Sequence, residues 1–355
     1  MGFLRQVPID TPVAVVVPGV IAFAAGCAVW RAKMGAYRVV SGLAVVVAVL
    51  VAGLAVVNVR TGTYQTVGSL IGGPLQLEAH AEVLGRPPAP GPLPGHGSLV
   101  SVDIPAADGG FRPRSAWVYL PPAWFGVGRG SLPVVELLHG TPGSPSDWVR
   151  KGQAQLTAER YASQHDRVAP VLIMPDINGA QTADSGCVDG RLGNIDTYLS
   201  TEVPRWAVRT LGVSGDRSRW VVGGLSEGGT CSVNLALRHP DRYAAFLAFS
   251  AADHIARPGE LTALFTGTPA EVAKAAQGYD PSSLLTQVSA TPPMRGWFEV
   301  GSDDGSTTKE TEAMAGLAHQ TLTDAKLVVV RGAGHEWPLW TQAFDDALPW
   351  LMSAM

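Results

Sequence analysis

The sequence predicts an α/β fold, in which a mostly parallel eight-stranded sheet carries helices on both faces and follows two transmembrane helices. Three observations support this fold class. Eight apolar or β-branched runs recur from residue 98 onward. Helical patterns separate the later runs. The first sixty residues hold two long apolar runs without a charge. The chain has 355 residues, of which 46% are hydrophobic, so it can bury a large core.

The two apolar runs cover residues 11–30 and 39–57. Each is long enough to cross roughly 30 Å of hydrocarbon, and we interpret them as two membrane spans. The alternative is a cleaved signal peptide followed by one anchor. Three basic residues lie between the two runs, namely Arg31, Lys33 and Arg38. Outside the runs, Arg5 precedes the first and Arg60 follows the second. The positive-inside rule therefore places the short loop in the cytoplasm and both termini outside.

Composition divides the chain into a membrane anchor (1–58), a connector (59–97) and a larger domain (98–355), called the catalytic domain for the motifs described below. The connector ends in a stretch rich in Pro and Gly, residues 86–95, which resists helix and strand alike. It is either a semi-extended spacer or an ordered strap on the following domain. The net charge of −4 provides no basic field, so nucleic acid is not an expected partner.

Within the catalytic domain, strands are expected at 99–102, 116–120, 134–138, 168–174, 220–222, 244–249, 297–300 and 327–330. Helices are expected at 153–163, 197–211, 229–238, 309–323 and 340–352. Because helices separate only the later strands, the sheet should begin antiparallel and continue parallel.

The pentapeptide at 224–228, Gly-Leu-Ser-Glu-Gly, follows a strand-like run and precedes a helix-like one. This context is typical of a nucleophile elbow, in which a tight turn exposes the hydroxyl of Ser226 and glycines allow close backbone approach. The elbow makes the α/β-hydrolase fold the expected version of the α/β class.

A serine nucleophile needs a base and an acid that orients it. His335 follows the last strand-like run and precedes the final helix, where this fold presents its histidine. The acid should follow an earlier strand, and Gly301-Ser302-Asp303-Asp304 fits that position. The spacing favours Asp304, with Asp303 as the alternate.

Two backbone amides should form the oxyanion hole. The residue after the nucleophile, Glu227, supplies one, and Thr141 in the loop His139-Gly140-Thr141-Pro142 supplies the other. A side chain of Glu227 facing the cleft would favour a cationic acyl group, whereas a glutamate facing the surface would have no such effect.

Several segments together resemble the esterase family of α/β-hydrolases that includes esterase D and the antigen 85-type mycolyltransferases. The resemblance covers about residues 98–353 and rests on the segments 137–148, 223–229, 238–241, 334–337 and 348–350. It implies that Ser226 is the nucleophile, His335 the base and Asp304 or Asp303 the third member, with amides of Glu227 and Thr141 in the oxyanion hole. The early loop reads His-Gly-Thr-Pro, where the mycolyltransferases have Asp-Gly-Leu-Arg.

Two further predictions concern the three cysteines and the aspartates of the stretch 176–196, here called the acidic loop. Cys27 falls in the first apolar run, while Cys187 and Cys231 either form a disulfide outside the membrane or stay as two buried thiols. Asp184 and Asp189 match no calcium-loop spacing, so we expect them to shape turns. Neither a metal nor a cofactor is implied.

The predicted function is a membrane-anchored serine esterase that hydrolyses an acyl ester, with a lipid-linked ester as one option, at the outer face of the cytoplasmic membrane. Its partners would be that ester or lipid and the membrane. An acyltransferase of mycolyltransferase type and a catalytically silent envelope scaffold are the alternatives. The Arg-, Ala- and Gly-rich composition suits an actinobacterial, high-GC genome.

Overall fold

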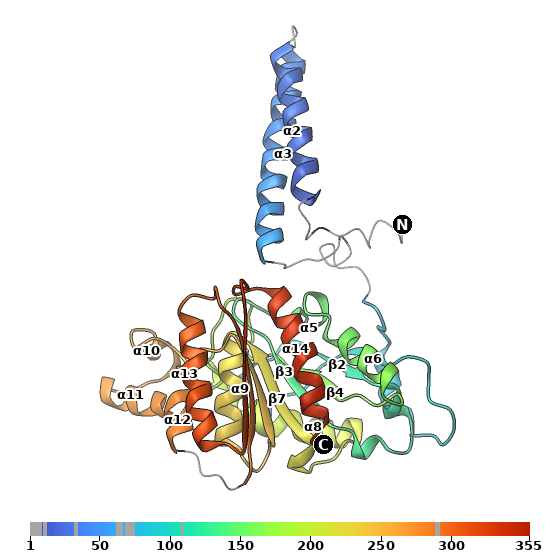
Figure 1. The fold of residues 1–355 in the computed structure, drawn as a ribbon, viewed down its shortest axis with the longest axis vertical. Coiled ribbons are helices and arrows are strands. Elements are labelled where there is room, and N and C mark those ends of the chain that lie inside the picture. The colour runs from blue at the N-terminus through green and yellow to red at the C-terminus, as the bar shows by residue number, and fades with distance from the viewer. Residues whose placement is uncertain are drawn as a thin grey trace. The chain divides into compact units, whose positions relative to one another are not determined.

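The computed structural model describes residues 9, 13–31, 35–61, 67, 75–107, 110–287 and 292–355. The chain forms two compact units, of which the first comprises residues 1–74 with 336–338 and the second comprises residues 75–335 with 339–355. In the first unit, helices α2 (Val13–Arg31) and α3 (Gly35–Thr61) lie side by side (Figure 1). Asn58 Nδ2 donates a hydrogen bond of 2.9 Å to the carbonyl of Ile9.

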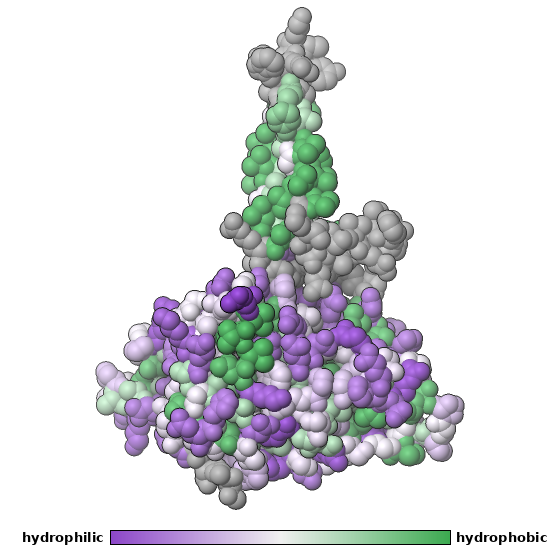
Figure 2. Space-filling view, in the orientation of Figure 1, coloured by the Kyte–Doolittle hydropathy of each residue, from purple (hydrophilic) through white to green (hydrophobic). Residues whose placement is uncertain are grey.

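Among the described residues, one helical segment, Gly42–Val59, is long and apolar enough to cross a membrane, and Val13–Ala24 is a shorter apolar helix. The qualifying segment overlaps the later of the two predicted runs, 39–57, so a pair of membrane spans that includes the run at 11–30 stays a prediction. Large apolar side chains of both helices are exposed, for example Phe23 at 76% and Leu54 at 71%, and Figure 2 shows hydrophobic residues gathered over this unit. The predicted orientation rests on basic residues of which Arg5 and Lys33 lie outside the described part, and it too stays a prediction.

The second unit is built on an eight-stranded sheet with the order β1-β2-β4-β3-β7-β8-β9-β10 (Figure 1). The strands are β1 (Ser98–Val102), β2 (Ala116–Leu120), β3 (Val134–Leu138), β4 (Val171–Met174), β7 (Trp220–Leu225), β8 (Ala245–Phe249), β9 (Arg295–Gly301) and β10 (Asp324–Val330). β1 pairs antiparallel with β2 and β2 antiparallel with β4, whereas all later pairs are parallel. The expected large, mostly parallel sheet is confirmed, and its strands coincide with the predicted runs.

The longer helices of this unit are α6 (Ala154–Gln164), α8 (Val203–Leu211), α9 (Glu227–Arg238), α13 (Ser306–Thr321) and α14 (Trp337–Met352). Shorter elements are α5 (Asp147–Arg150), α7 (Ile195–Thr197), α10 (Leu261–Leu264), α11 (Pro269–Gln277), α12 (Pro281–Gln287), η1 (Ala81–Gly85), η2 (Pro122–Phe125), η3 (Arg129–Ser131), the π-helical η4 (Tyr198–Glu202) and η5 (Arg217–Arg219). A separate two-stranded ribbon pairs β5 (Asp189–Gly190) with β6 (Gly193–Asn194).

Both faces of the sheet are buried, which explains why its strands are apolar throughout rather than alternating. On one face, Val222 of β7 belongs to the same buried cluster as Val233 of α9 and Met314 of α13. On the other face, Phe249 of β8 packs against Trp148, whose ring also contacts Phe344 of α14.

Residues 253–287, here called the insert, lie between β8 and β9 and contain α10, α11 and α12, none of which was expected from the sequence. The insert has a small hydrophobic cluster of its own, which includes Ile255, Leu264, Phe265 and Val272 together with Val188 from the loop after β4. A capping box at Thr268 and Glu271 starts α11.

The described part of the predicted connector, from Leu75 onward, belongs to the second unit and lies on it as a strap. The amide of Ala79 donates to the carbonyl of Leu99, and the amide of Leu99 donates to the carbonyl of Leu77, both at 2.8 Å. The amide of Ala89 donates to the carbonyl of Phe125 at 3.1 Å. Val83 is buried in the main core.

A disulfide joins Cys187, in the loop after β4, to Cys231 in α9, with the two Cα atoms 5.6 Å apart. Of the two alternatives for this pair, the structure contains the bonded one. Cys27 is a free thiol.

Candidate active site

Ser226 lies on the turn between β7 and α9 with φ 55° and ψ −122°, a conformation that costs a non-glycine residue about 1–3 kcal/mol. The surroundings enforce this geometry. The amide of Ser226 donates to Phe249 at 2.9 Å, and its carbonyl accepts from the amide of Thr230 at 3.0 Å. The turn therefore presents the hydroxyl of Ser226 at the carboxyl edge of the sheet, as a nucleophile elbow does.

The elbow requires glycine where α9 crosses the end of β3. A Cβ atom at Gly228 would lie 2.4 Å from the carbonyl oxygens of both Leu138 and His139. Only glycine lets the first turn of α9 approach β3 this closely.

Ser226, His335 and Asp304 form a continuous chain of hydrogen bonds. The hydroxyl of Ser226 lies 2.9 Å from Nε2 of His335, and Nδ1 of the same ring lies 2.9 Å and 3.1 Å from the two carboxylate oxygens of Asp304. Because a carboxylate only accepts, the Nδ1 proton is donated to Asp304, which leaves Nε2 to accept a proton from Ser226. Ser226 follows β7, Asp304 follows β9 and His335 follows β10. Because these strands are parallel, the loops that follow them meet at one edge of the sheet.

Of the two aspartates considered from the sequence, the structure brings Asp304 to His335 and leaves Asp303 apart. The side chain of Asp304 is 2% exposed. Asp303 is exposed and accepts a hydrogen bond of 2.8 Å from Ser302. A Cβ at Gly301 would lie 2.1 Å from the carbonyl oxygen of Ala333, so glycine at the start of this turn lets the acid and histidine loops approach.

The ring of His335 is supported from α14. Trp340 packs edge-on against it with ring centroids 4.9 Å apart, and its indole N–H donates to the hydroxyl of Ser250 at 3.0 Å. The side chain of His335 is 42% exposed, so substrate and solvent can reach it.

Both predicted oxyanion donors border the nucleophile. A Cβ at Gly140 would lie 3.1 Å from Cβ of Ser226, so the loop carrying Thr141 runs directly beside the elbow. Within the described part of the chain, the amides of Thr141 and Glu227 have no hydrogen-bond acceptor. The two N–H groups are therefore available to a substrate oxygen.

The side chain of Glu227 joins the loops after β3 and β4. Its Oε2 contacts the hydroxyl of Thr141 and accepts from Nδ2 of Asn178 at 2.7 Å, while Oε1 accepts from the amide of Ser185 at 3.0 Å. Burial raises the pKa of Glu227 well above its ordinary value, and the negative charge of Asp184 raises it further.

A buried ion-pair network supports residues 139–143, here called the oxyanion loop because it carries the amide of Thr141. Asp176 accepts hydrogen bonds from Nη2 of Arg114 at 2.6 Å and lies 3.1 Å from Nε2 of His139, and Arg114 also donates to the carbonyl of Gly143 at 3.0 Å. Although burial opposes ionisation, the hydrogen bonds from His139 and Arg114 lower the pKa of Asp176 below its usual range.

Sequence reasoning missed Asn178, Ser185 and Arg114 as parts of this site. The signal available was weak, because Asn and Ser among glycines also form ordinary turns.

A cavity of about 210 Å³ opens beside the nucleophile. Ser226, His335 and Thr141 line it, as do Asp184 and Glu227. The insert adds three polar side chains, which are His254, Arg257 and Glu260. The cavity is therefore small and strongly polar.

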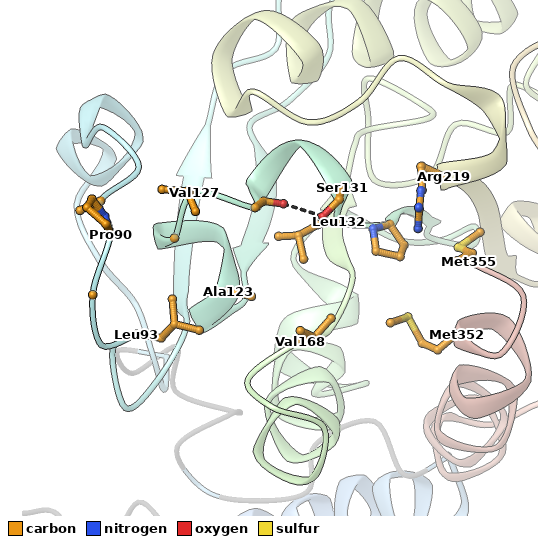
Figure 3. Close-up of a pocket in the computed structure, with 15 residues that line it drawn as sticks. Pro90, Leu93, Ala123, Val127, Ser131, Leu132, Val168, Arg219, Met352 and Met355 are labelled. Atoms are coloured by element: carbon orange, nitrogen blue, oxygen red, sulfur yellow. Dashed lines mark hydrogen bonds between the residues drawn. The ribbon is translucent and has the colours of Figure 1, made fainter.

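A larger cavity of about 540 Å³ lies elsewhere, between the strap and the body of the second unit (Figure 3). Leu93 of the strap and Met352 of α14 line it, together with Arg219 and Pro133, which precede β7 and β3. These residues mark the amino edge of the parallel strands, whereas Ser226 and His335 are at the carboxyl edge. No member of the Ser-His-Asp chain borders this larger cavity.

Within the described ranges, one group of side chains has a spacing that could hold a metal ion, namely Asp253, His254 and Glu310, whose ligand atoms lie within 4.8 Å of one another. Asp253 and His254 pair with each other at 2.6 Å, which accounts for their proximity without an ion. Asp189, from the acidic loop, accepts from the hydroxyl of Thr197 at 2.6 Å and shapes a turn.

The mostly parallel sheet, its flanking helices and the serine on the turn after β7 together define an α/β-hydrolase. The chain belongs to the family described as "Putative esterase", whose model matches residues 112–351. A relative from Corynebacterium glutamicum, an uncharacterized protein, is 30% identical over 353 residues, which cover 94% of this chain and 82% of the relative.

Solved structures share the fold at lower identity. A ferulic acid esterase is 21% identical with a TM-score of 0.58, and the match covers 74% of this chain and all of that one. The S-formylglutathione hydrolase of Agrobacterium tumefaciens is 18% identical with a TM-score of 0.58 over 74% and 97% of the two chains. MPT51 of Mycobacterium tuberculosis is 20% identical with a TM-score of 0.50 over 70% and 99%.

Proposed function

We propose that this protein is a membrane-anchored serine esterase whose catalytic unit lies outside the cytoplasmic membrane. The observation that carries the proposal is the chain of hydrogen bonds from Ser226 through His335 to Asp304. Family membership supports hydrolysis of an ester, and the hydrogen-bonded chain supplies a specific mechanism for it.

In the proposed reaction, the hydroxyl oxygen of Ser226 attacks the ester carbonyl while Nε2 of His335 takes the hydroxyl proton. The negative charge on the carbonyl oxygen is stabilised by the amides of Thr141 and Glu227, and Asp304 stabilises the imidazolium. His335 then returns the proton to the leaving alcohol. Water activated by His335 hydrolyses the acyl-enzyme and frees Ser226.

The cavity beside Ser226 favours an ester whose acyl or alcohol group is short and polar. Its volume of about 210 Å³ is below the range of a drug-sized ligand, and charged side chains line it. A lipid-linked ester would have to keep its chains outside this cavity. The contacts of Glu227 with Thr141, Asn178 and Ser185 leave it poorly placed to bind a cationic acyl group directly.

Two observations support membrane anchoring and an extracytoplasmic site. Helix α3 contains an apolar segment of 18 residues with a mean hydropathy of 2.7, of which only 6% is buried. The Cys187–Cys231 disulfide suits an oxidising compartment.

An acyltransferase is the second candidate, because an acceptor hydroxyl could replace water in the second step. The solvent-exposed ring of His335 allows either acceptor to approach. Faster turnover on addition of a sugar or lipid alcohol would distinguish transfer from hydrolysis.

The test uses the full chain in detergent, a fluorophosphonate label and hydrolysis of p-nitrophenyl acetate. We expect the label on Ser226 and no turnover by Ser226→Ala, because the nucleophile is lost. Asp304→Asn should lower kcat by about 10⁴-fold, since the histidine would lose its orientation and tautomer.

Asp303→Asn is the matched control and should stay within about twofold of wild type, because Asp303 does not contact His335. Absence of both label and turnover in the folded wild-type protein would reject the esterase and favour the silent scaffold. Equal losses in the two aspartate variants would reject the assignment of Asp304.

A further inference from the structure

The hydroxyl of Thr141 has three polar neighbours in hydrogen-bonding positions. Oγ1 lies 2.8 Å from the carbonyl oxygen of Ala183 and 2.7 Å from Nδ2 of Asn178, and it makes a short contact with Oε2 of Glu227. A hydroxyl group carries one proton and accepts at two lone pairs. The positions of the protons around Thr141 can therefore be assigned from the chemistry of its neighbours.

Asn178 occupies one lone pair of that hydroxyl. The orientation of its amide is fixed because Oδ1 accepts from the amide of Ser185 at 2.9 Å, which directs Nδ2 toward Thr141 and Glu227. The carbonyl of Ala183 can only accept, so it takes the hydroxyl proton of Thr141. One lone pair of Oγ1 then remains, and it faces Oε2 of Glu227.

Two acceptors cannot bond to each other without a proton between them. If Glu227 were ionised, either Ala183 or Glu227 would face a lone pair of Thr141 at close range. A proton on Glu227 resolves this conflict, because the carboxylic acid then donates to Thr141 and all three contacts of the Thr141 hydroxyl become hydrogen bonds.

We infer that Glu227 is a positioning residue which works as a neutral carboxylic acid and, by donating a hydrogen bond to Thr141, fixes the oxyanion loop against the nucleophile elbow. This inference rests on the proposed esterase function. Thr141 supplies an oxyanion amide, so a bond to its side chain holds that amide in place. Glu227 thus contributes its amide to the oxyanion hole and its acid group to the alignment of the other donor.

The electrostatic surroundings favour the neutral acid. Burial raises the pKa of Glu227. The carboxyl group of Asp184, which is within hydrogen-bonding reach, raises the pKa of Glu227 further. The cavity wall carries four other titratable or charged groups, which are His254, Arg257, Glu260 and His335. The buried network that supports the oxyanion loop adds Arg114, His139 and Asp176. No ion pair joins Glu227 to a cation among the described residues.

Ionisation of Glu227 should reduce activity for two reasons. It removes the proton donated to Thr141, and it leaves a carboxylate beside the oxygen that becomes negative in the transition state. Turnover should therefore fall at alkaline pH as Glu227 loses its proton.

The experiment measures kcat and KM of the full chain for p-nitrophenyl acetate from about pH 6 to about pH 10. Glu227→Gln cannot ionise, and its amide nitrogen can still donate to Thr141 but no longer accepts from Asn178, so kcat should be lower at every pH while its alkaline fall disappears. Asp184→Asn removes the charge that raises the pKa of Glu227, so the fall should move to lower pH.

Thr141→Val and Thr141→Ser form a matched pair. The valine removes the hydroxyl with little change in shape and should lower kcat about tenfold or more, with a smaller effect on KM. The serine keeps the hydroxyl and should restore most of the rate. Melting temperatures of all variants identify any that fail to fold.

The inference is overturned if kcat of Glu227→Gln falls at alkaline pH with the same midpoint as kcat of the wild type. It is also overturned if kcat of the wild type stays level to the highest pH. Either result leaves the esterase intact, because Ser226 would still be labelled and turn over substrate. Absence of turnover and label in the wild type would instead reject the proposed function.

Discussion

Glu299 lies within β9 with no exposed surface, although carboxyl groups are rarely found in such positions. Its Oε2 accepts a hydrogen bond of 3.0 Å from the indole of Trp297, and Oε1 has no partner among the described residues. Burial raises the pKa of Glu299 from 4.5 to about 7, and Asp346 adds to the rise. The group is therefore neutral in the folded state over a pH range in which the unfolded chain would ionise it.

This shift predicts a pH-dependent stability. A raised pKa stabilises the folded state fully below about pH 4.5, and the stabilisation is lost as pH rises toward 7. Glu299→Gln removes the ionisation, so the variant should gain about 3 kcal/mol of unfolding free energy relative to wild type between about pH 4 and pH 8. Denaturant unfolding at both pH values measures this difference.

Glu312→Gln, on the exposed side of α13, is the control and should show no such gain. If the stability difference between Glu299→Gln and wild type is the same at both pH values, Glu299 does not titrate in this range.

At the scale of elements, the Cys187–Cys231 disulfide connects the loop after β4 to α9. The loop also carries Asn178 and Ser185, which bond to Glu227 at the start of the same helix. The bond closes a segment of 44 residues. It therefore fixes, relative to the elbow, the loop that completes the site.

Replacing both cysteines with alanine should lower stability by about 2–5 kcal/mol, because the unfolded chain regains the freedom that the closed loop removes. Thermal melting with and without a thiol reductant tests this expectation. Reductant should lower the melting temperature of wild type and leave that of Cys187→Ala/Cys231→Ala unchanged. A variant as stable as oxidised wild type would contradict the prediction.

The elements that could be predicted from the sequence are those with strong periodic or apolar signals. All eight strands overlap the predicted runs, for example at 134–138 and 220–222, because strands buried on both faces must be apolar throughout. The insert gave no such signal, since its helices have four to nine residues and bury only a few side chains each.

The same distinction applies to the site. The spacing around Ser226, Asp304 and His335 pointed to residues that the fold brings together, because each follows a recognisable strand. The spacing left Asp303 as an alternative to Asp304 for the acid that orients His335. Only the geometry of the turn distinguishes the two aspartates. The partners of Glu227 could not be found from sequence, because they come from two loops whose contacts no local pattern encodes.

At the scale of the whole molecule, the exposed apolar surface of α2 and α3 predicts tight membrane association. The full chain should remain in the membrane pellet after alkaline carbonate extraction, since apolar helices of this length hold far more strongly than surface charge. Protease added to intact spheroplasts should degrade the catalytic unit while a cytoplasmic marker enzyme survives.

Release by carbonate would reject the anchor. Protection of the catalytic unit until the membrane is permeabilised would instead reverse the proposed orientation, and it would also leave the disulfide in a reducing compartment.

The insert leaves the sheet after β8 and returns at β9, yet those two strands pair directly, with Ala245 opposite Arg295 and Phe249 opposite Glu299. The positions of Ser226, Asp304 and His335 are set by strands and turns to which the insert contributes no residue. The insert nevertheless supplies His254, Arg257 and Glu260 to the cavity wall. One part of that wall is consequently encoded in a stretch of the gene that can change in length or sequence while the hydrogen-bonded residues keep their strands and turns.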